Sequence, residues 1–162
     1  MPIRTVTRSI DLAVDADRAW EAVGHPDGLA TWLGSSVEVQ GEAARLGAGA
    51  VAVVVDHDGR RRRAVVAERR EGAALTFTWW DEAEPEHAST VRIELEATAD
   101  GSRVTVTETA DAAVPLGGAG RARGDPRPAA ARSVEGLRRA ACGESVTIRQ
   151  RAEAVHAAAQ AA

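Results

Sequence analysis

Hydrophobic and polar residues alternate along much of the first 110 positions, most clearly at residues 75–80. In this segment, LTFTWW, the odd-numbered positions are Leu, Phe and Trp, and the even-numbered ones are Thr, Thr and Trp. A period of two is typical of a strand with one buried face. The segment holds the only Phe and two of the four Trp of a chain without Tyr. It therefore predicts the floor of a concave sheet.

The same alternation predicts strands on both sides of this segment, which itself extends over 73–80. The other strands are expected at 3–14, 37–40, 51–55, 61–69, 90–97 and 103–109. An apolar stripe with helical spacing follows Asp15, a favourable N-cap, and Asp27 is expected to cap a short helix at 28–33. Beyond residue 112, Gly and Pro predict a loop at 113–128, before a helix at 129–142 and an Ala-rich helical tail at 143–162.

Three pairs of residues ending in Gly lie between predicted strands and are typical of two-residue β-turns. They are Asp58-Gly59, Glu71-Gly72 and Asp100-Gly101. Such turns fix which residues face one another. The pairs predicted in this way are Val53–Ala64, Val51–Val66, Ala64–Trp79, Val66–Phe77, Leu95–Val106 and Ile93–Glu108. Across the longer loop at 81–89, matching of apolar faces predicts the pairs Phe77–Ile93 and Trp79–Val91. The apolar faces agree across all three hairpins, which predicts an antiparallel meander over 51–109.

Composition and charge narrow the function classes. The chain has 20 basic and 24 acidic residues, so its net charge of −4 gives no reason to expect nucleic acid. The Arg residues at 60–63 alternate across a predicted strand and form no single patch; Arg62 faces inward, where it is expected to meet Asp81. Cys142 is alone and the four His lie on separate elements, so neither a disulfide, a metal site nor a cofactor is expected.

No apolar run reaches membrane-spanning length, and the first residues lack the apolar core of a signal peptide. These features predict a cytoplasmic protein that does not bind membranes. The sequence does not indicate an oligomeric state.

The order of elements resembles the START-like, or helix-grip (SRPBCC), superfamily. The segments that carry the resemblance are Ala19-Trp20, LATWLG at 29–34, LTFTWW at 75–80 and VTVTE at 104–108. Within the superfamily, the chain is similar to the branch named after the activator of Hsp90 ATPase homologue. The resemblance implies an α+β fold in which a curved antiparallel sheet, with two short helices, grips a C-terminal closing helix and encloses a cavity. The domain is expected to span residues 1–142, although its Gly/Pro/Arg-rich loop and Trp-free closing helix depart from the family's pattern.

Two charges interrupt the otherwise apolar inner face, Arg8 on the first strand and Glu108 on the last. In the helix-grip order these strands pair, and aligning their apolar positions places Ile10 opposite Val106 and Leu12 opposite Val104. That alignment also predicts a pair between Arg8 and Glu108. A charge facing a core is costly unless it is paired, so a bidentate Arg–carboxylate contact is expected. The alternatives are a bulge or a slip that turns one of the two side chains outward, or a pair near the open end of the sheet.

The inner-face pattern, together with the resemblance, predicts the residues that line the cavity. They are Arg8, Val66, Phe77, Trp79, Val91, Ile93, Glu108, Val134 and Leu137. Trp20 and Trp32 are expected to anchor the two short helices to the sheet, because aromatic residues on a helix face usually belong to the core.

A concave apolar sheet with few polar groups predicts non-enzymatic binding of a small apolar or amphipathic molecule. The resemblance leaves two other classes open. An aromatase/cyclase-like or hydrolytic enzyme would need acid–base groups in the cavity, for which Arg8 and Glu108 are the candidates. A chaperone-cofactor-like interaction module would need an exposed docking face. No GxSxG motif or Cys/His pairing supports a catalytic nucleophile.

Overall fold

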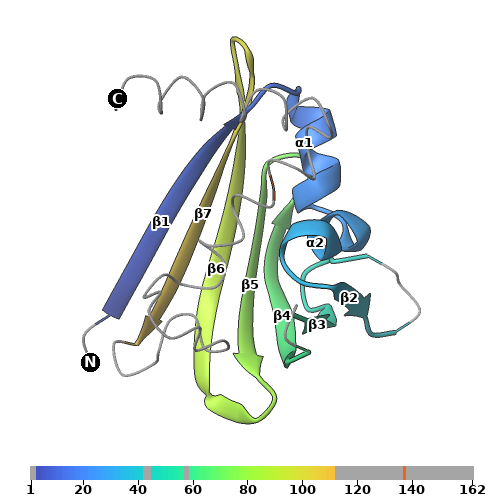
Figure 1. Ribbon diagram of the computed structural model, residues 1–162, viewed down its shortest axis with the longest axis vertical. Helices are drawn as coiled ribbons and strands as arrows, with labels where there is room; N and C mark the ends of the chain where they lie inside the picture. Colours follow the sequence, from blue (N-terminus) through green and yellow to red (C-terminus); the bar gives the residue numbers. More distant parts are fainter. Residues whose placement is uncertain (1–2, 42–44, 57–58, 112–136, 138–162) are drawn as a thin grey trace, which may run out of the picture.

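The computed structural model describes residues 3–41, 45–56, 59–111 and 137. Seven strands form one antiparallel sheet in the order β1-β7-β6-β5-β4-β3-β2 (Figure 1). The strands are β1 (Ile3–Leu12), β2 (Ser36–Val39), β3 (Val51–Val55), β4 (Arg61–Arg70), β5 (Ala74–Asp81), β6 (Glu84–Thr98) and β7 (Gly101–Asp111). Helices α1 (Ala16–Val23) and α2 (Pro26–Trp32) pack against the same core as the inner face of the sheet.

The predicted order of elements is confirmed over the described residues. Strands β2 to β7 follow one another as a meander, and β1 closes the sheet by pairing with β7. The predicted loop at 113–128 and the helical tail at 143–162 lie outside the described residues. The predicted closing helix at 129–142 is described only at Leu137, which is helical, fully buried and part of the core.

The first helix begins as its sequence predicts, whereas the second does not. The carboxylate of Asp15 accepts a hydrogen bond from the backbone N–H of Arg18 (2.8 Å). The second helix was expected to start at Gly28 with Asp27 as its cap, but it starts at Pro26, whose fixed φ suits the first turn. His25 is therefore the N-cap, and the Asp27 carboxylate lies within the first turn.

Both helical Trp residues are buried anchors, as predicted. Trp32 donates its indole N–H to a backbone carbonyl of α1 (2.9 Å). Trp20 donates to the carboxylate of Glu71 (2.7 Å), and Arg69 lies over the Trp20 ring, 5.1 Å from its centroid. Arg69 also pairs with Glu71 (2.8 Å) and donates to the carbonyl of Gly24. Trp20, Arg69 and Glu71, called the α1 clasp below, thus tie α1 to the β4–β5 turn.

The predicted register between β3 and β4 is wrong by one residue. The observed pairs are Val51–Val65, Ala52–Ala64 and Val53–Arg63, instead of Val51–Val66 and Val53–Ala64. The loop between these strands is longer than a two-residue turn. The hydrogen bond from the N–H of Asp56 to the carbonyl of Arg60 (2.9 Å) closes it. A one-residue shift exchanges the faces of a strand. Ala52 and Val54 therefore join the inner-face core, whereas Val53 is buried outside that cluster.

The predicted register between β4 and β5 is confirmed over the centre of the sheet. Its pairs Ala64–Trp79 and Val66–Phe77 are both observed. The turn itself has three residues rather than two, since Arg70 pairs with Ala74, and Gly72 has a φ of 72°. A register shift between Val66 and Glu68 compensates for the extra residue. Two local departures from the prediction thus cancel before the strands reach Phe77.

The remaining predicted registers are wrong by two residues. The observed pairs are Phe77–Val91, Trp79–Ser89, Ile93–Val106, Leu95–Val104, Ile10–Val104, Leu12–Ser102, Arg8–Val106 and Val6–Glu108. The β6–β7 turn consists of residues 99–100, because Thr98 pairs with Gly101, the first residue of β7. A side chain at Gly101 would place its Cβ 2.1 Å from the carbonyl oxygen of Leu12, so only glycine fits there.

A shift of two residues keeps every side chain on its predicted face. The shifts at β5–β6 and β6–β7 also cancel, so Phe77 and Glu108 lie in one row, as predicted. The residue between them on β6 is Val91, whereas Ile93 was predicted.

The outer face is polar: hydroxyl pairs connect neighbouring strands at Thr5–Thr109, Thr7–Thr107, Ser9–Thr105 and Thr78–Thr90. None of the described helices has the length and apolarity that a membrane span requires.

Candidate functional site

Strand β5 carries the aromatic centre of the inner face. Alternation along the strand turns Phe77 and Trp79 inward, and both are buried. Their rings meet edge to face, with centroids 5.6 Å apart and an interplanar angle of 77°. Trp80 points to the other face and is partly exposed, as expected. An apolar region lies next to Phe77, and a charged region lies next to Trp79.

An apolar pocket of about 20 Å³ lies beside Phe77. It is lined by Leu29, Leu33, Val37, Leu46, Ala52, Val54, Ala64, Val66, Leu75 and Phe77. We refer to these ten residues as the apolar pocket. A cavity needs roughly 10–15 Å³ to hold one water molecule, so the pocket has room for little more than a water molecule and a larger guest requires side chains to move. Leu29 of α2 and Leu46 form part of its lining.

A charged cluster lies on the other side of Trp79. Glu108 is only 2% exposed, and its Oε1 accepts hydrogen bonds from Ser89 Oγ (2.7 Å) and Trp79 Nε1 (3.3 Å). Trp79 Nε1 also donates to Ser89 Oγ (2.9 Å). The second carboxylate oxygen, Oε2, is buried and has no hydrogen-bond partner among the described residues. One carboxylate oxygen therefore accepts from two donors, whereas the other accepts from none among the described residues.

Arg62 completes the charged cluster, which we define as Arg62, Trp79, Ser89 and Glu108. Its guanidinium lies over the Trp79 ring, 4.5 Å from the centroid, and the side chain is 5% exposed. Burial lowers the pKa of Arg62, and the negative charges of Glu108, Asp56 and Asp81 oppose that shift. Arg62 faces Asp81 across β4 and β5, as predicted. The cluster therefore holds one buried cation over the ring of an indole and one buried carboxylate at the N–H of the same indole.

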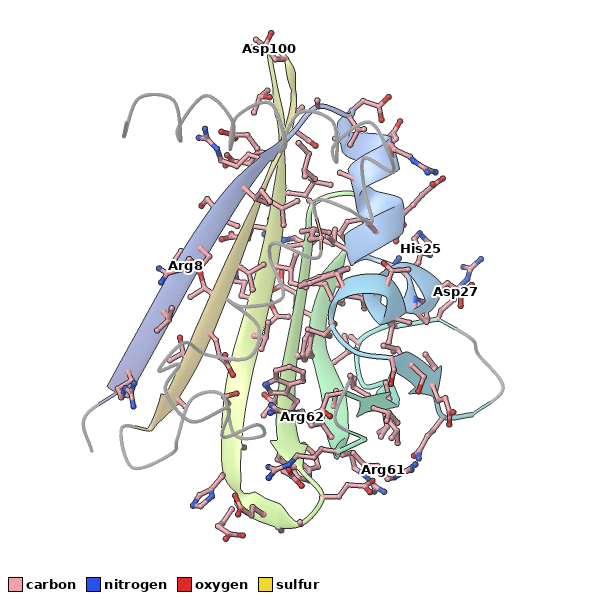
Figure 2. All side chains as sticks on the ribbon, viewed as in Figure 1. Arg8, His25, Asp27, Arg61, Arg62 and Asp100 are labelled. Atoms are coloured by element: carbon pink, nitrogen blue, oxygen red, sulfur yellow. The ribbon has the colours of Figure 1, made fainter. Side chains whose placement is uncertain are left out.

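The predicted contact between Arg8 and Glu108 is wrong. The two-residue shift places Val6 opposite Glu108 and Arg8 opposite Val106. Since β1 is an edge strand, Arg8 reaches solvent, where its Nη1 donates to the carbonyl of Thr7 (3.2 Å). Figure 2 shows Arg8 projecting from β1, far from Arg62 at the other side of the sheet. The buried partner charge thus comes from β4 and not from β1.

The other predicted cavity residues divide between the two regions and the core. Val66 and Phe77 line the apolar pocket, whereas Trp79 and Glu108 belong to the charged cluster. The remaining predicted residues that the structure describes, Val91, Ile93 and Leu137, are fully buried core residues. Val134 lies outside the described residues.

Sequence reasoning missed Ser89 and the role of Arg62 in this site. Both could have been found from the alternation alone. Ser89 continues the inward-facing positions of β6, and Arg62 continues those of β4. Ser89 and Arg62 are polar residues on an apolar face, and their strands flank the strand of Trp79. This placement indicates that both interact with Trp79.

The cluster can recognise a polar group, and its carboxylate can exchange a proton with a bound molecule. The described residues contain no group of three His, Cys, Asp or Glu side chains placed to hold a metal ion.

A family model described as polyketide cyclase / dehydrase and lipid transport matches residues 4–143. Among solved structures, the chain is similar to DynU16, a putative protein in the dynemicin biosynthetic locus, with 21% identity and a TM-score of 0.62. That match covers 83% of this chain and 46% of DynU16, so the chain spans less than half of that protein. No curated protein matches the sequence.

Two further structures match over nearly their whole length. Protein MLL2253 from Mesorhizobium loti has 17% identity and a TM-score of 0.61, covering 85% of this chain and 96% of that protein. Ara h 8.0201 has 15% identity and a TM-score of 0.60, covering 90% of this chain and 99% of that protein. At these identities the similarity shows the fold.

Proposed function

Because the chain belongs to the polyketide cyclase / dehydrase and lipid transport family of the helix-grip superfamily, we propose that it binds a small apolar or amphipathic molecule on the inner face of its sheet. The observation that carries the proposal is the juxtaposition on β5. Phe77 lines an apolar pocket, and Trp79, two residues further on, bonds to a buried carboxylate. An apolar wall with a few convergent polar groups is the usual composition of a small-molecule site.

The volume of the pocket is too small for such a molecule, so binding must displace side chains of the inner face. Phe77 is the residue best placed to move, because it touches both the pocket and the ring of Trp79. The similarity to the branch of the activator of Hsp90 ATPase homologue stays a prediction, as does the domain boundary at residue 142.

Native mass spectrometry of freshly purified protein tests the proposal without a choice of ligand. A retained molecule is expected, visible as a mass increment that denaturation removes. Its identification by fragmentation would give the ligand class. If the protein carries no increment and also binds no apolar probe, the proposal is wrong.

A fluorescence titration then locates the site. N-phenyl-1-naphthylamine, a neutral apolar probe, is expected to quench tryptophan emission in the native protein and to do so far less in Trp79→Phe. Trp80→Phe is the matched control, because it removes the neighbouring Trp from the outer face and leaves the quenching intact. Equal quenching in all three proteins would move the site away from β5.

One observation favours a second function, catalysis on the bound molecule. A buried carboxylate with an unpartnered oxygen beside a hydroxyl is a candidate general acid–base group. Incubation of the purified protein with the molecule identified above, followed by mass spectrometry, distinguishes the two functions. A new product that disappears in Glu108→Gln supports an enzyme, whereas an unchanged ligand supports binding alone.

A further inference from the structure

The carboxylate of Glu108 is used on one side only. Oε1 accepts from both Ser89 and Trp79, which fixes the plane of the carboxylate. Oε2 is buried without a partner among the described residues. A carboxylate accepts hydrogen bonds on both oxygens, and a buried acceptor left without a donor is costly. The site therefore favours a molecule that brings a hydrogen-bond donor.

The charge balance of the cluster restricts which donor fits. Arg62 and Glu108 are the buried charged side chains of the described part of the chain, and Glu108 is the largest of the negative charges that act on Arg62, ahead of Asp56 and Asp81. A ligand carboxylate would place a second negative charge beside Glu108 in a desolvated site, which is strongly unfavourable. A hydroxyl group donates a hydrogen bond without adding charge.

The distance between the two regions sets the shape of the ligand. Phe77 of the apolar pocket and Trp79 of the charged cluster are two residues apart on β5, about 7 Å at the usual rise of a strand. One small molecule can therefore span both, with its apolar body replacing the Phe77 contacts and its polar end at Glu108.

We infer that the bound molecule is a neutral amphipath whose hydroxyl group donates to Glu108 Oε2, and that the charged cluster selects against molecules ending in a carboxylate. The inference rests on the proposed binding function and names the chemical class that this site accepts.

Three matched probes test it: naphthalene, 2-naphthol and 2-naphthoate share one apolar body and differ in their polar end. Isothermal titration calorimetry, or saturation-transfer NMR for the least soluble probe, gives the affinities. A hydrogen bond to a charged acceptor predicts that the native protein binds 2-naphthol about tenfold more tightly than naphthalene. Binding of 2-naphthoate should be the weakest of the three.

Variants assign the selectivity to the carboxylate. Glu108→Gln keeps the shape and removes the charge, so 2-naphthol should lose about tenfold in affinity, while naphthalene changes by less than about twofold. Binding of 2-naphthoate should improve. Glu96→Gln, an exposed change on β6, is the control and should alter none of the three. Circular dichroism checks that each variant folds, and Ser89→Ala, which keeps the charge, serves if Glu108→Gln does not fold.

The outcomes separate the inference from the proposed function. If none of the probes binds to the native protein and none quenches Trp79, the binding function itself fails. If naphthalene and 2-naphthol bind equally, or if 2-naphthoate binds most tightly, binding stands and the hydroxyl inference is overturned. Ser89→Ala should reduce the preference for 2-naphthol over naphthalene by a few-fold, because Oε1 loses a donor that orients the carboxylate. An unchanged preference in this variant, together with Glu108→Gln folded and equally selective, also overturns it.

Discussion

The apolar pocket and the charged cluster lie on the same face and share β5, but different forces hold them. The pocket is lined by side chains without polar atoms and contains a space of about 20 Å³. Its stability depends on buried area and on packing, so each change there has a limited cost. The cluster depends on hydrogen bonds and charge interactions between buried groups, so removing one member takes an interaction away from the others.

Because different forces hold the two regions, we expect them to recognise different parts of a ligand. A pocket of small and branched apolar residues can adapt to the body of a guest, whereas a carboxylate fixed by two donors accepts a narrow range of polar groups. Arg8 reinforces the point. Its position in the alternation of β1 is that of the core residues. At the edge of the sheet, however, its guanidinium reaches water and needs no buried carboxylate as a partner.

The largest expected effect is the loss of the buried carboxylate. Glu108→Leu removes the acceptor for Ser89 and Trp79 and takes away the largest of the negative charges that act on the buried guanidinium of Arg62. We expect the free energy of unfolding to fall by roughly 3–5 kcal/mol. Urea unfolding followed by circular dichroism measures the change.

The double variant Arg62→Met/Glu108→Leu sharpens this test. If the two charges compensate each other, the double variant should be more stable than Glu108→Leu alone. Additive losses from the two single changes would contradict the coupling, and a Glu108→Leu protein as stable as the native one would contradict the cluster.

A smaller effect is expected in the apolar pocket. Val66 is 3% exposed and lines the pocket, so Val66→Ala should cost about 2 kcal/mol by the loss of buried apolar area. Val65→Ala is the matched control, because Val65 is the adjacent residue and is only partly buried on the other face. Urea unfolding should show a clearly smaller loss in the control. Equal losses would mean that the inner face is not the more tightly packed one.

The hydroxyl of Ser89 should matter less than either. Ser89→Ala removes one donor to Glu108 Oε1, while Trp79 Nε1 still reaches that oxygen. A cost of about 1 kcal/mol follows from the usual net contribution of such a hydrogen bond. The comparable change Thr107→Ala, at a hydroxyl pair on the outer face, should have almost no effect in the same unfolding measurement. A larger loss in Thr107→Ala would reverse the comparison between the two faces.

The smallest expected effect concerns an exposed carboxylate and depends on pH. Hydrogen bonds from Arg69 and Trp20 hold the pKa of Glu71 below its ordinary value of 4.5. A lowered pKa in the folded state means that the contribution to stability is present above the ordinary value and disappears as the pH falls through the lowered one. Thermal unfolding of Glu71→Gln should therefore differ from the native protein at pH 7 and converge with it in acid. A difference that grows in acid would contradict the α1 clasp.

The alternation of the sequence predicted the faces of the strands better than their partners. Leu75, Phe77 and Trp79 alternate so regularly that their burial follows from the period of a strand alone. Partners depend on turn length, which a residue pair such as Asp100-Gly101 does not determine. There the glycine starts β7, and the close approach of the Leu12 carbonyl is the reason for it.

The site was predicted only in part, because the sequence gives the face of each residue more reliably than its neighbour on the next strand. Errors of two residues preserved the faces, so the prediction that Glu108 lies on the inner face is confirmed by its burial. The same errors assigned it the wrong cation, because Arg8 was moved two residues along an edge strand. In the structure the cation beside Glu108 is Arg62, which lies over the ring of Trp79 from the neighbouring strand β4.

If a small molecule binds on the inner face at β5, the indole N–H signals of the four Trp residues should report it. In a two-dimensional ¹H–¹⁵N NMR titration with 2-naphthol, the signal assigned to Trp79 through Trp79→Phe should shift and reach saturation. The signal of Trp80, on the outer face, should stay in place. A Trp79 signal that does not move while the probe binds, or a shift confined to Trp80, would contradict the account.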